Sequence, residues 1–230
     1  MNTETENQPG MNRRHFLLVT CSATFALILQ RSIAGIPNAQ ASQKFVESTC
    51  GKDGKSKKRV LIAYASRCGS TGSIAEAMAG VLCGVGASVD VRLVKKVKDL
   101  SPYQAVIVGS AIRAGRWLPE ATNFVKNNQD SLSRLPTAYF VVCLTMKDDT
   151  PGNRHKVLAY LDPVRKGVPK ITPTTVGLFP GVVDFNKLSF VHETMLKARG
   201  VVEGDYRNWP AVKGWASNMG PGLFAAQRRG

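Results

Sequence analysis

Continuous apolar runs recur along the middle of the chain. Residues 60–65 form the first run, and similar runs occupy 104–109, 137–144 and 174–179. Such runs are typical of parallel strands that are buried on both faces of a sheet. Residues 88–94 instead alternate between apolar and polar positions, which predicts an edge strand.

Between these runs, apolar residues recur at helical spacing. In residues 71–85 they are Ile74, Ala75, Met78, Ala79 and Leu82. Further helices are predicted at 119–132, 154–161, 187–198 and 209–218. Strands that alternate with helices predict βαβ crossovers, so we expect one α/β domain over residues 59–220, with a doubly wound, five-stranded parallel sheet and helices on both faces. Ligands of such sheets bind at the carboxyl ends of the strands.

Residues 1–41 have the character of an export signal. Arg13 and Arg14 precede an apolar run at 16–29, whose 14 residues are too few to span a bilayer. A small-x-small cleavage site ends at Ala41. The order Arg-Arg-x-Phe-Leu resembles a twin-arginine signal, which implies export of the folded protein to the periplasm and cleavage after Ala41. The alternative is a signal that is retained as a membrane anchor.

Charge is the unusual feature of an otherwise ordinary globular composition. The 230 residues include 31 Lys and Arg against 16 Asp and Glu, a net charge of +15. Residues 1–58 hold eight basic and four acidic residues, a net +4, so residues 59–230 carry +11. This charge favours an anionic membrane surface, an acidic protein or a carboxylate-bearing substrate as partner. The sequence has no helix-turn-helix, zinc-finger or aromatic RNA-binding pattern, so we expect no nucleic acid.

The segments that flank the domain are poor in apolar residues. Residues 42–58 are rich in Ser, Gly and Lys and predict a linker. Residues 221–230 predict a frayed tail.

The loop after the first apolar run has the composition of an anion site. It contains Ser66, Arg67, Cys68, Gly69, Ser70 and Thr71. Free N–H groups and the positive end of the helix dipole bind anions at a helix start, and the hydroxyl groups add donors. The alternative is a plain helix cap, with Ser73 and Glu76 as a capping box. The sequence contains neither the lysine-bearing loop of nucleoside triphosphatases nor a G-x-G-x-x-G dinucleotide loop after this run.

The spacing Tyr64-x-Ser66-x-x-Gly69-x-Thr71-x-x-x-Ala75 resembles the FMN-phosphate signature of the flavodoxin family. Residues 109–116 and 203–209 resemble the menaquinone-dependent protoporphyrinogen oxidases within that family. The resemblance covers residues 59–218. It implies FMN as the cofactor and the flavodoxin strand order 2-1-3-4-5.

By the same resemblance, the loops at 110–117 and 145–147 flank the isoalloxazine ring. Besides the six residues of the first loop, the implied cofactor-binding residues are Ser110, Ala111, Ile112, Arg113, Gly115, Trp117, Thr145 and Met146. Trp117 either stacks on the ring or packs at the start of the next helix. Arg113 and Arg116 lie either beside the ring or on the solvated surface.

Four cysteines follow the expected cleavage site, namely Cys50, Cys68, Cys83 and Cys143. In an oxidising compartment they allow two disulfides in three connectivities, and the sequence selects none of them. His155 and His192 lack neighbouring metal ligands, so we expect no metal.

The function that we expect is that of an FMN-dependent oxidoreductase, which passes electrons between a reduced substrate and a quinone-like acceptor. Because the flavin supplies the redox chemistry, no side chain is assigned as a catalyst. The first alternative is a non-enzymatic flavodoxin-type electron-transfer protein that docks on a redox partner. The second is a flavin-free binding protein on the same fold.

Overall fold

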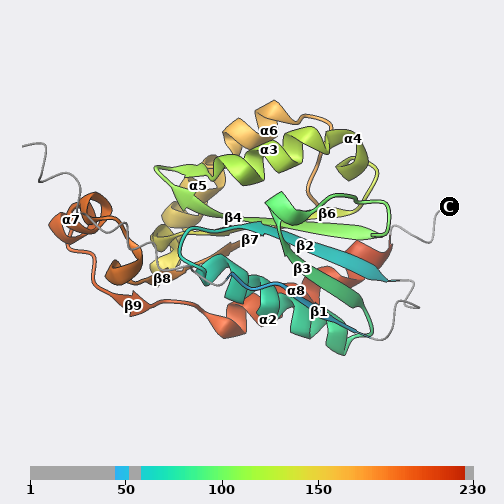
Figure 1. Cartoon of the computed structure of the whole chain (residues 1–230), viewed down its shortest axis with the longest axis horizontal. Helices are drawn as coiled ribbons and strands as arrows, with labels where there is room; N and C mark the ends of the chain where they lie inside the picture. Colours follow the sequence, from blue (N-terminus) through green and yellow to red (C-terminus); the bar gives the residue numbers. More distant parts are fainter. Residues whose placement is uncertain (1–44, 52–57, 226–230) are drawn as a thin grey trace, which may run out of the picture. The chain divides into compact units, whose positions relative to one another are not determined.

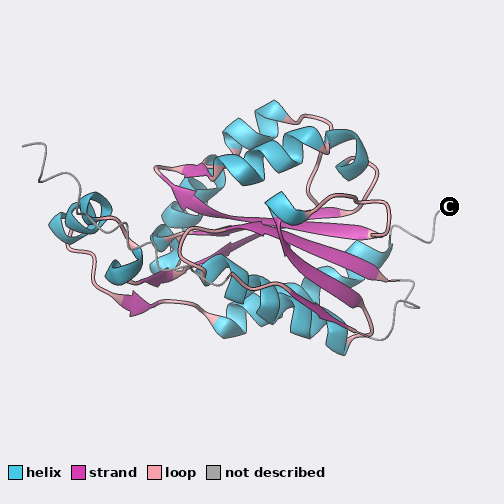
Figure 2. Ribbon diagram, viewed as in Figure 1, coloured by secondary structure: helices cyan, strands magenta, loops and turns pink. Residues whose placement is uncertain are grey.

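A computed structural model describes residues 45–51 and 58–225, and the expected signal lies outside them. The main sheet has the order β1-β3-β2-β4-β6-β7 (Figure 1, Figure 2). Its parallel strands are β3 (Ser88–Leu93), β2 (Arg59–Ala65), β4 (Ala105–Arg113), β6 (Thr137–Val142) and β7 (Val176–Phe179). They correspond to the five predicted strands in the order 2-1-3-4-5, which confirms the doubly wound α/β fold.

Helices cover both faces of the sheet (Figure 1). One face carries α2 (Ser70–Gly84) and α8 (Trp209–Ala225). The other carries α3 (Pro119–Asn127), α4 (Gln129–Leu132), α5 (Pro151–Ala159) and α6 (Asp162–Gly167). Two of the predicted helices differ from the structure. The segment 119–132 is divided between α3 and α4, and α8 continues past 218 into the expected tail. Among the helices of the described residues, none combines the length and the apolar character needed to cross a membrane.

Because helices cover both faces of the sheet, the sequences of the central strands are continuously apolar. In β2, Ile62 and Tyr64 belong to the core cluster with α2 and α8, whereas Leu61 and Ala63 belong to the cluster with α3 and α5. All four side chains are fully buried. A parallel strand between two helical layers has no solvent-facing side, so its sequence shows no polar alternation.

The segment expected to be a linker contributes an additional strand, which corrects that expectation. β1 (Ser48–Cys50) pairs antiparallel with β3 and therefore occupies the edge that β3 was expected to form. A disulfide joins Cys50 to Cys83 near the end of α2. In addition, the hydroxyl group of Tyr64 donates a 2.7 Å hydrogen bond to the carbonyl oxygen of Val46. Tertiary contacts thus hold a segment whose composition is that of a loop.

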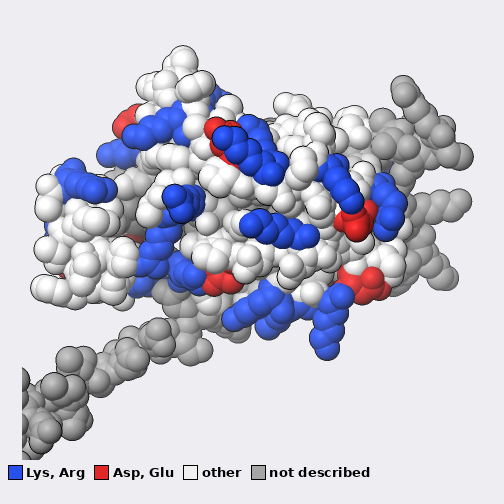
Figure 3. All heavy atoms as spheres, turned by 90° about the horizontal axis from the view of Figure 1, so that it is seen from above, with Lys and Arg blue, Asp and Glu red and all other residues white. Residues whose placement is uncertain are grey.

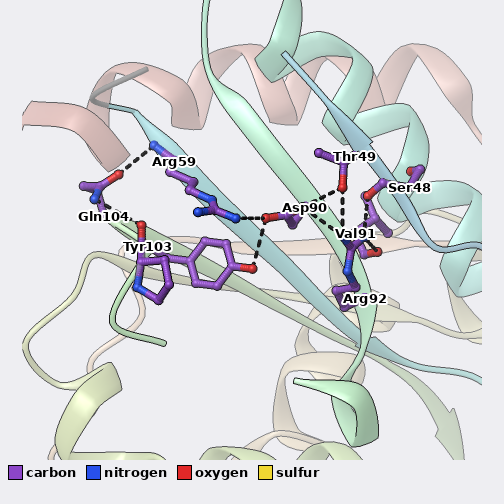
Figure 4. A network of polar contacts seen from close by, with 9 residues as sticks. Ser48, Thr49, Arg59, Asp90, Val91, Arg92, Tyr103 and Gln104 are labelled. Atoms are coloured by element: carbon purple, nitrogen blue, oxygen red, sulfur yellow. Dashed lines mark hydrogen bonds and ion pairs between the residues drawn. The ribbon is translucent and has the colours of Figure 1, made fainter. Parts of the chain in front are cut away.

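Asp90 is the centre of a polar network across β1, β3 and β2 (Figure 4). Its carboxylate accepts hydrogen bonds from Thr49 at 2.6 Å and from Arg59 and Tyr103 at 3.0 Å, and it pairs with Arg92. Burial alone would raise the pKa of Asp90, but these hydrogen bonds and the Arg92 charge outweigh burial and lower the pKa. Asp90, which is only 3% exposed, is therefore held in its charged form.

After β7 the chain leaves the main sheet and returns before α8. This excursion contains β8 (Val182–Val183), η3 (Phe185–Lys187), α7 (Phe190–Ala198) and β9 (Gly204–Asp205). β8 and β9 form a separate two-stranded antiparallel sheet. In Figure 1 the excursion lies at the left, beyond the ends of the strands. The helix predicted at 187–198 is present as α7, but it lies outside the main core.

Candidate functional site

Three loops follow the carboxyl ends of neighbouring parallel strands and therefore lie at the same end of the sheet. Ala65 of β2 is paired with Ser110 of β4, and Ser110 is paired with Val141 of β6. The segments that follow these positions are 66–69, 110–118 and 143–147. The register thus brings together the three loops that carry the expected cofactor-binding residues.

The first loop is shaped by Ser66 and Gly69. The N–H group of Gly69 donates a 3.0 Å hydrogen bond to Oγ of Ser66, and Gly69 has a φ of 90°, which favours glycine. Gly69 is also the N-cap of α2, and no side chain caps this helix. The hydroxyl group of Ser73 donates to the carbonyl oxygen of Ser70, so the alternative of a capping box is wrong.

Thr71 provides the clearest sign of a missing partner at the start of α2. It is fully buried, and its Oγ1 atom has no hydrogen-bond partner among the described residues. An unpaired hydroxyl group is unfavourable inside a protein, and here it lies in the first turn of a helix, where N–H groups attract anions. A phosphate group at this position would give the hydroxyl an acceptor.

The second loop is a hairpin in which the hydroxyl group of Ser110 makes two hydrogen bonds to the backbone. Its buried Oγ atom accepts the N–H of Leu118 at 3.0 Å and donates to the carbonyl oxygen of Ala111 at 2.8 Å. The turn before β5 (Arg116–Trp117) has positive φ angles at Ala114 and Gly115. Ser110 therefore orders the loop and has its hydroxyl group engaged there.

Trp117 and Met146 are buried beneath the site loops. Trp117 is 4% exposed and packs edge-on against Tyr139, with ring centroids 5.1 Å apart. Of the two alternatives for Trp117, the structure thus favours packing over stacking on a flavin. Met146 is likewise buried in this cluster. Ala111, Ile112, Gly115 and Thr145 are partly exposed, whereas Arg113 and Arg116 are exposed at the rim.

A fourth element, which was missing from the expected site residues, comes from 180–209. Nη1 of Arg207 donates a 2.6 Å hydrogen bond to Oγ of Ser73 in the first turns of α2. A Cβ atom on Gly181 would lie only 3.1 Å from Oγ of Ser70, so the chain after β7 passes close to the helix start. The resemblance at 203–209 pointed to this stretch, but it did not indicate that Arg207 reaches α2.

The excursion also contacts the first two loops. The thiol of Cys68 donates to the carbonyl oxygen of Lys187 at 3.6 Å, and Arg113 contacts His192 of α7. Burial raises the pKa of Cys68, and the nearby Arg113 and Lys187 only partly oppose this effect. Cys68 is therefore a neutral thiol rather than a reactive thiolate. The residues of 45–51 and 58–225 contain no cluster of three metal-ligating side chains.

The family described as "Flavodoxin domain" matches residues 61–207. The chain is 27% identical over 178 residues to "Protoporphyrinogen IX dehydrogenase [quinone]" of Leishmania major, covering 70% of this chain and 74% of that protein. It is 30% identical over 91 residues to the protein of the same name from Escherichia coli K12, covering 39% of this chain and half of that protein.

Solved structures of low sequence identity resemble the chain as well. A flavodoxin from the domain Archaea has a TM-score of 0.43 at 16% identity, over 72% of this chain and 98% of that one. Oxidised Flavodoxin 2 from Bacillus cereus has a TM-score of 0.45 at 18% identity, over 74% and 99% of the two chains.

Proposed function

Because the chain belongs to the flavodoxin domain family, we propose that it is an FMN-dependent oxidoreductase that passes electrons from a reduced substrate to a quinone-like acceptor. The names of the two relatives suggest a protoporphyrinogen-like donor and a quinone acceptor. In each turnover, two electrons and two protons leave the donor and convert one quinone to a quinol. Bound FMN supplies chemistry that exchanges electrons with both the donor and the acceptor.

The observation that carries the proposal is the unpaired, buried hydroxyl group of Thr71 at the start of α2. FMN is the cofactor implied by the family, and the residues around Thr71 fit its phosphate. Gly69 leaves the helix start without a side-chain cap, and Ser70 adds a second hydroxyl group. Arg207, which is ion-paired with Asp205, also donates a hydrogen bond to Ser73 in the first turns of α2 and so lies beside this helix start.

The other two loops would position the ring. Ser110 fixes the hairpin, in which Ala111 and Gly115 are partly exposed. Arg113 and Arg116 place positive charge at its rim. These side chains bind and orient, and none of them is assigned a proton-transfer step.

The proposed location is the periplasm, after export by the signal in residues 1–41. The disulfide between Cys50 and Cys83 supports this location, because disulfides persist in oxidising compartments and are rare in the cytosol. Retention of the signal as a membrane anchor is the competing arrangement.

The test combines cofactor identification with turnover. Purified protein is expected to be yellow, to release FMN rather than FAD, and to oxidise protoporphyrinogen IX with menadione and no added protein. Thr71→Val removes the unpaired hydroxyl group and serves as the weakened-cofactor control. Protein that neither contains nor takes up FMN would overturn the proposal. FMN-loaded protein that exchanges electrons only with a second protein would replace it with the electron-transfer alternative.

A further inference from the structure

The helix α7 exposes its apolar side to solvent. Phe190 is 80% exposed, Val191 71% and Met195 43%, and none of its residues is buried. At 100° per residue, these three side chains lie within an arc of roughly 140° on the helix. Thr194 and Ala198, which share this arc, are exposed too. A helix that packs on a core would bury this side.

Contacts on the opposite side of α7 hold the apolar side outward. His192, Glu193 and Leu196 are partly buried there. The Nδ1 atom of His192 lies 2.6 Å from Oγ of Ser189, and the same ring contacts Arg113 of the β4–β5 hairpin. The contact between His192 and Arg113 thus ties this side of the helix to the body of the domain.

Positive charge lies on the site loops and at the end of α7. Arg113, Arg116, Lys147 and Arg199 have no ion-pair partner within the part of the chain that the structure describes. Arg113, Arg116 and Lys147 belong to the site loops, and Arg199 caps the end of α7. Two acidic residues of the excursion are already engaged, Asp184 with Lys187 and Glu193 with Lys197. Figure 3 shows Lys and Arg spread across one face with few acidic residues between them.

We propose that α7 docks the domain on an anionic lipid bilayer, with Phe190, Val191 and Met195 inserted among the lipids and the unpaired cations against the phosphates. Apolar side chains combined with flanking cations are the features of interfacial helices. A single nine-residue helix offers far less surface than the roughly 1,200–2,000 Å² of a stable protein interface, which favours lipid over a protein partner. The inference rests on the proposed function, because a site beside the membrane gives access to a lipid-soluble quinone.

The test uses the full-length, FMN-loaded protein and a probe confined to α7. A Phe190→Trp variant is mixed with vesicles of phosphatidylglycerol and phosphatidylcholine that carry brominated acyl chains. Added quenching relative to wild type is expected, because the new indole enters the lipid. Val85→Trp is the matched control, since Val85 is 59% exposed but lies at the opposite end of α2 from the site. Because the probe is local, an apolar amino-terminal segment that binds the vesicles would not mimic this result.

A second variant removes the apolar side. Phe190→Ser/Val191→Ser/Met195→Ser is expected to lower turnover with a long-chain quinone embedded in the vesicles about tenfold, while turnover with water-soluble menadione is unchanged. Absence of extra quenching in Phe190→Trp would overturn the docking proposal, as would a dimer that the triple variant dissociates. Quenching without turnover of any quinone would retain the docking and overturn the proposed function, so the two failures are distinguishable.

Discussion

The guanidinium group of Arg113 contacts the imidazole ring of His192, with Nη2 2.8 Å from Nδ1. These residues are far apart in sequence, and their contact joins the second loop of the site to α7. It leaves the arginine charge at the rim of the site, in contact with an imidazole ring rather than with a carboxylate. The charge of Arg113 is therefore available to the proposed cofactor.

Replacement of both rim arginines is expected to lower the midpoint potential of bound FMN. A nearby cation stabilises the reduced, anionic flavin, so Arg113→Ala/Arg116→Ala should shift the two-electron midpoint potential downward by roughly 20 mV per arginine after solvent screening. A spectroelectrochemical titration measures the shift. Arg134→Ala provides a matched control, because Arg134 is exposed and precedes β6 at the other end of the sheet. Equal potentials in all three proteins would contradict the placement of these charges beside the flavin.

Thr71→Val is expected to lower the affinity for FMN without lowering the stability of the apoprotein. Valine matches the shape of threonine but has no hydroxyl group, so FMN should bind about tenfold more weakly as one hydrogen bond is lost. The apoprotein should be no less stable, because Oγ1 of Thr71 has no partner to lose. Fluorescence titration and thermal unfolding measure the two quantities. A destabilised apoprotein with unchanged FMN affinity would assign Thr71 a structural role instead.

Loss of the disulfide is expected to destabilise the domain without removing the cofactor site. The bond closes a loop across 33 residues, and its removal by Cys50→Ser/Cys83→Ser should lower the free energy of unfolding by about 3–4 kcal/mol. Urea denaturation measures this change. Cys68→Ser is the control, since Cys68 is a free cysteine of the same domain. If a reducing agent left the wild type as stable as before, the bond would have no part in holding β1.

Asp90→Asn is expected to destabilise the protein at neutral pH and much less in acid. The pKa of Asp90 is lowered in the folded state, so its contribution is complete above the unfolded pKa of about 4 and is lost as the pH falls through the folded pKa. At pH 7 the lost charged hydrogen bonds should lower the free energy of unfolding by about 1–3 kcal/mol. Denaturation curves at pH 7 and pH 3 provide the comparison. A difference between variant and wild type that grows in acid would refute the ionised network.

Arg13→Lys/Arg14→Lys is expected to leave the protein in the cytoplasm. A twin-arginine route depends on this pair, so cell fractionation should show the precursor inside the cell. The reducing cytosol should also leave Cys50 and Cys83 as thiols that react with a maleimide. A single Arg31→Lys change is the control. Normal export of the double variant would exclude the twin-arginine route.

The central strands could be predicted from the sequence because burial on two faces produces a local signal. The run at 60–65 needs no information from elsewhere in the chain. β1 could not be predicted in this way, since the three residues Ser48–Cys50 contain neither an apolar run nor a long enough alternation. Their conformation depends on pairing with β3 and on a bond to Cys83, which are both distant in sequence.

The same distinction applies to the site. The residues of the first loop are contiguous and carry a recognisable spacing, so the sequence alone predicts Gly69 and Thr71 as candidates. The position of Arg207 depends on how the chain returns from the excursion to α8, which no local pattern encodes. The sequence of α7 has an apolar side typical of a packed helix, yet that side faces solvent, whereas His192 on the other side contacts Arg113.

The short strand β1 also has a consequence for solubility. Without it, β3 would present a bare row of N–H and C=O groups, which is a template for recruiting a strand from another molecule. β1 covers Val89, Asp90 and Val91 and replaces a six-residue edge with one of three residues. Release of β1 under reducing conditions would therefore expose an edge of β3 on which two molecules could pair edge to edge.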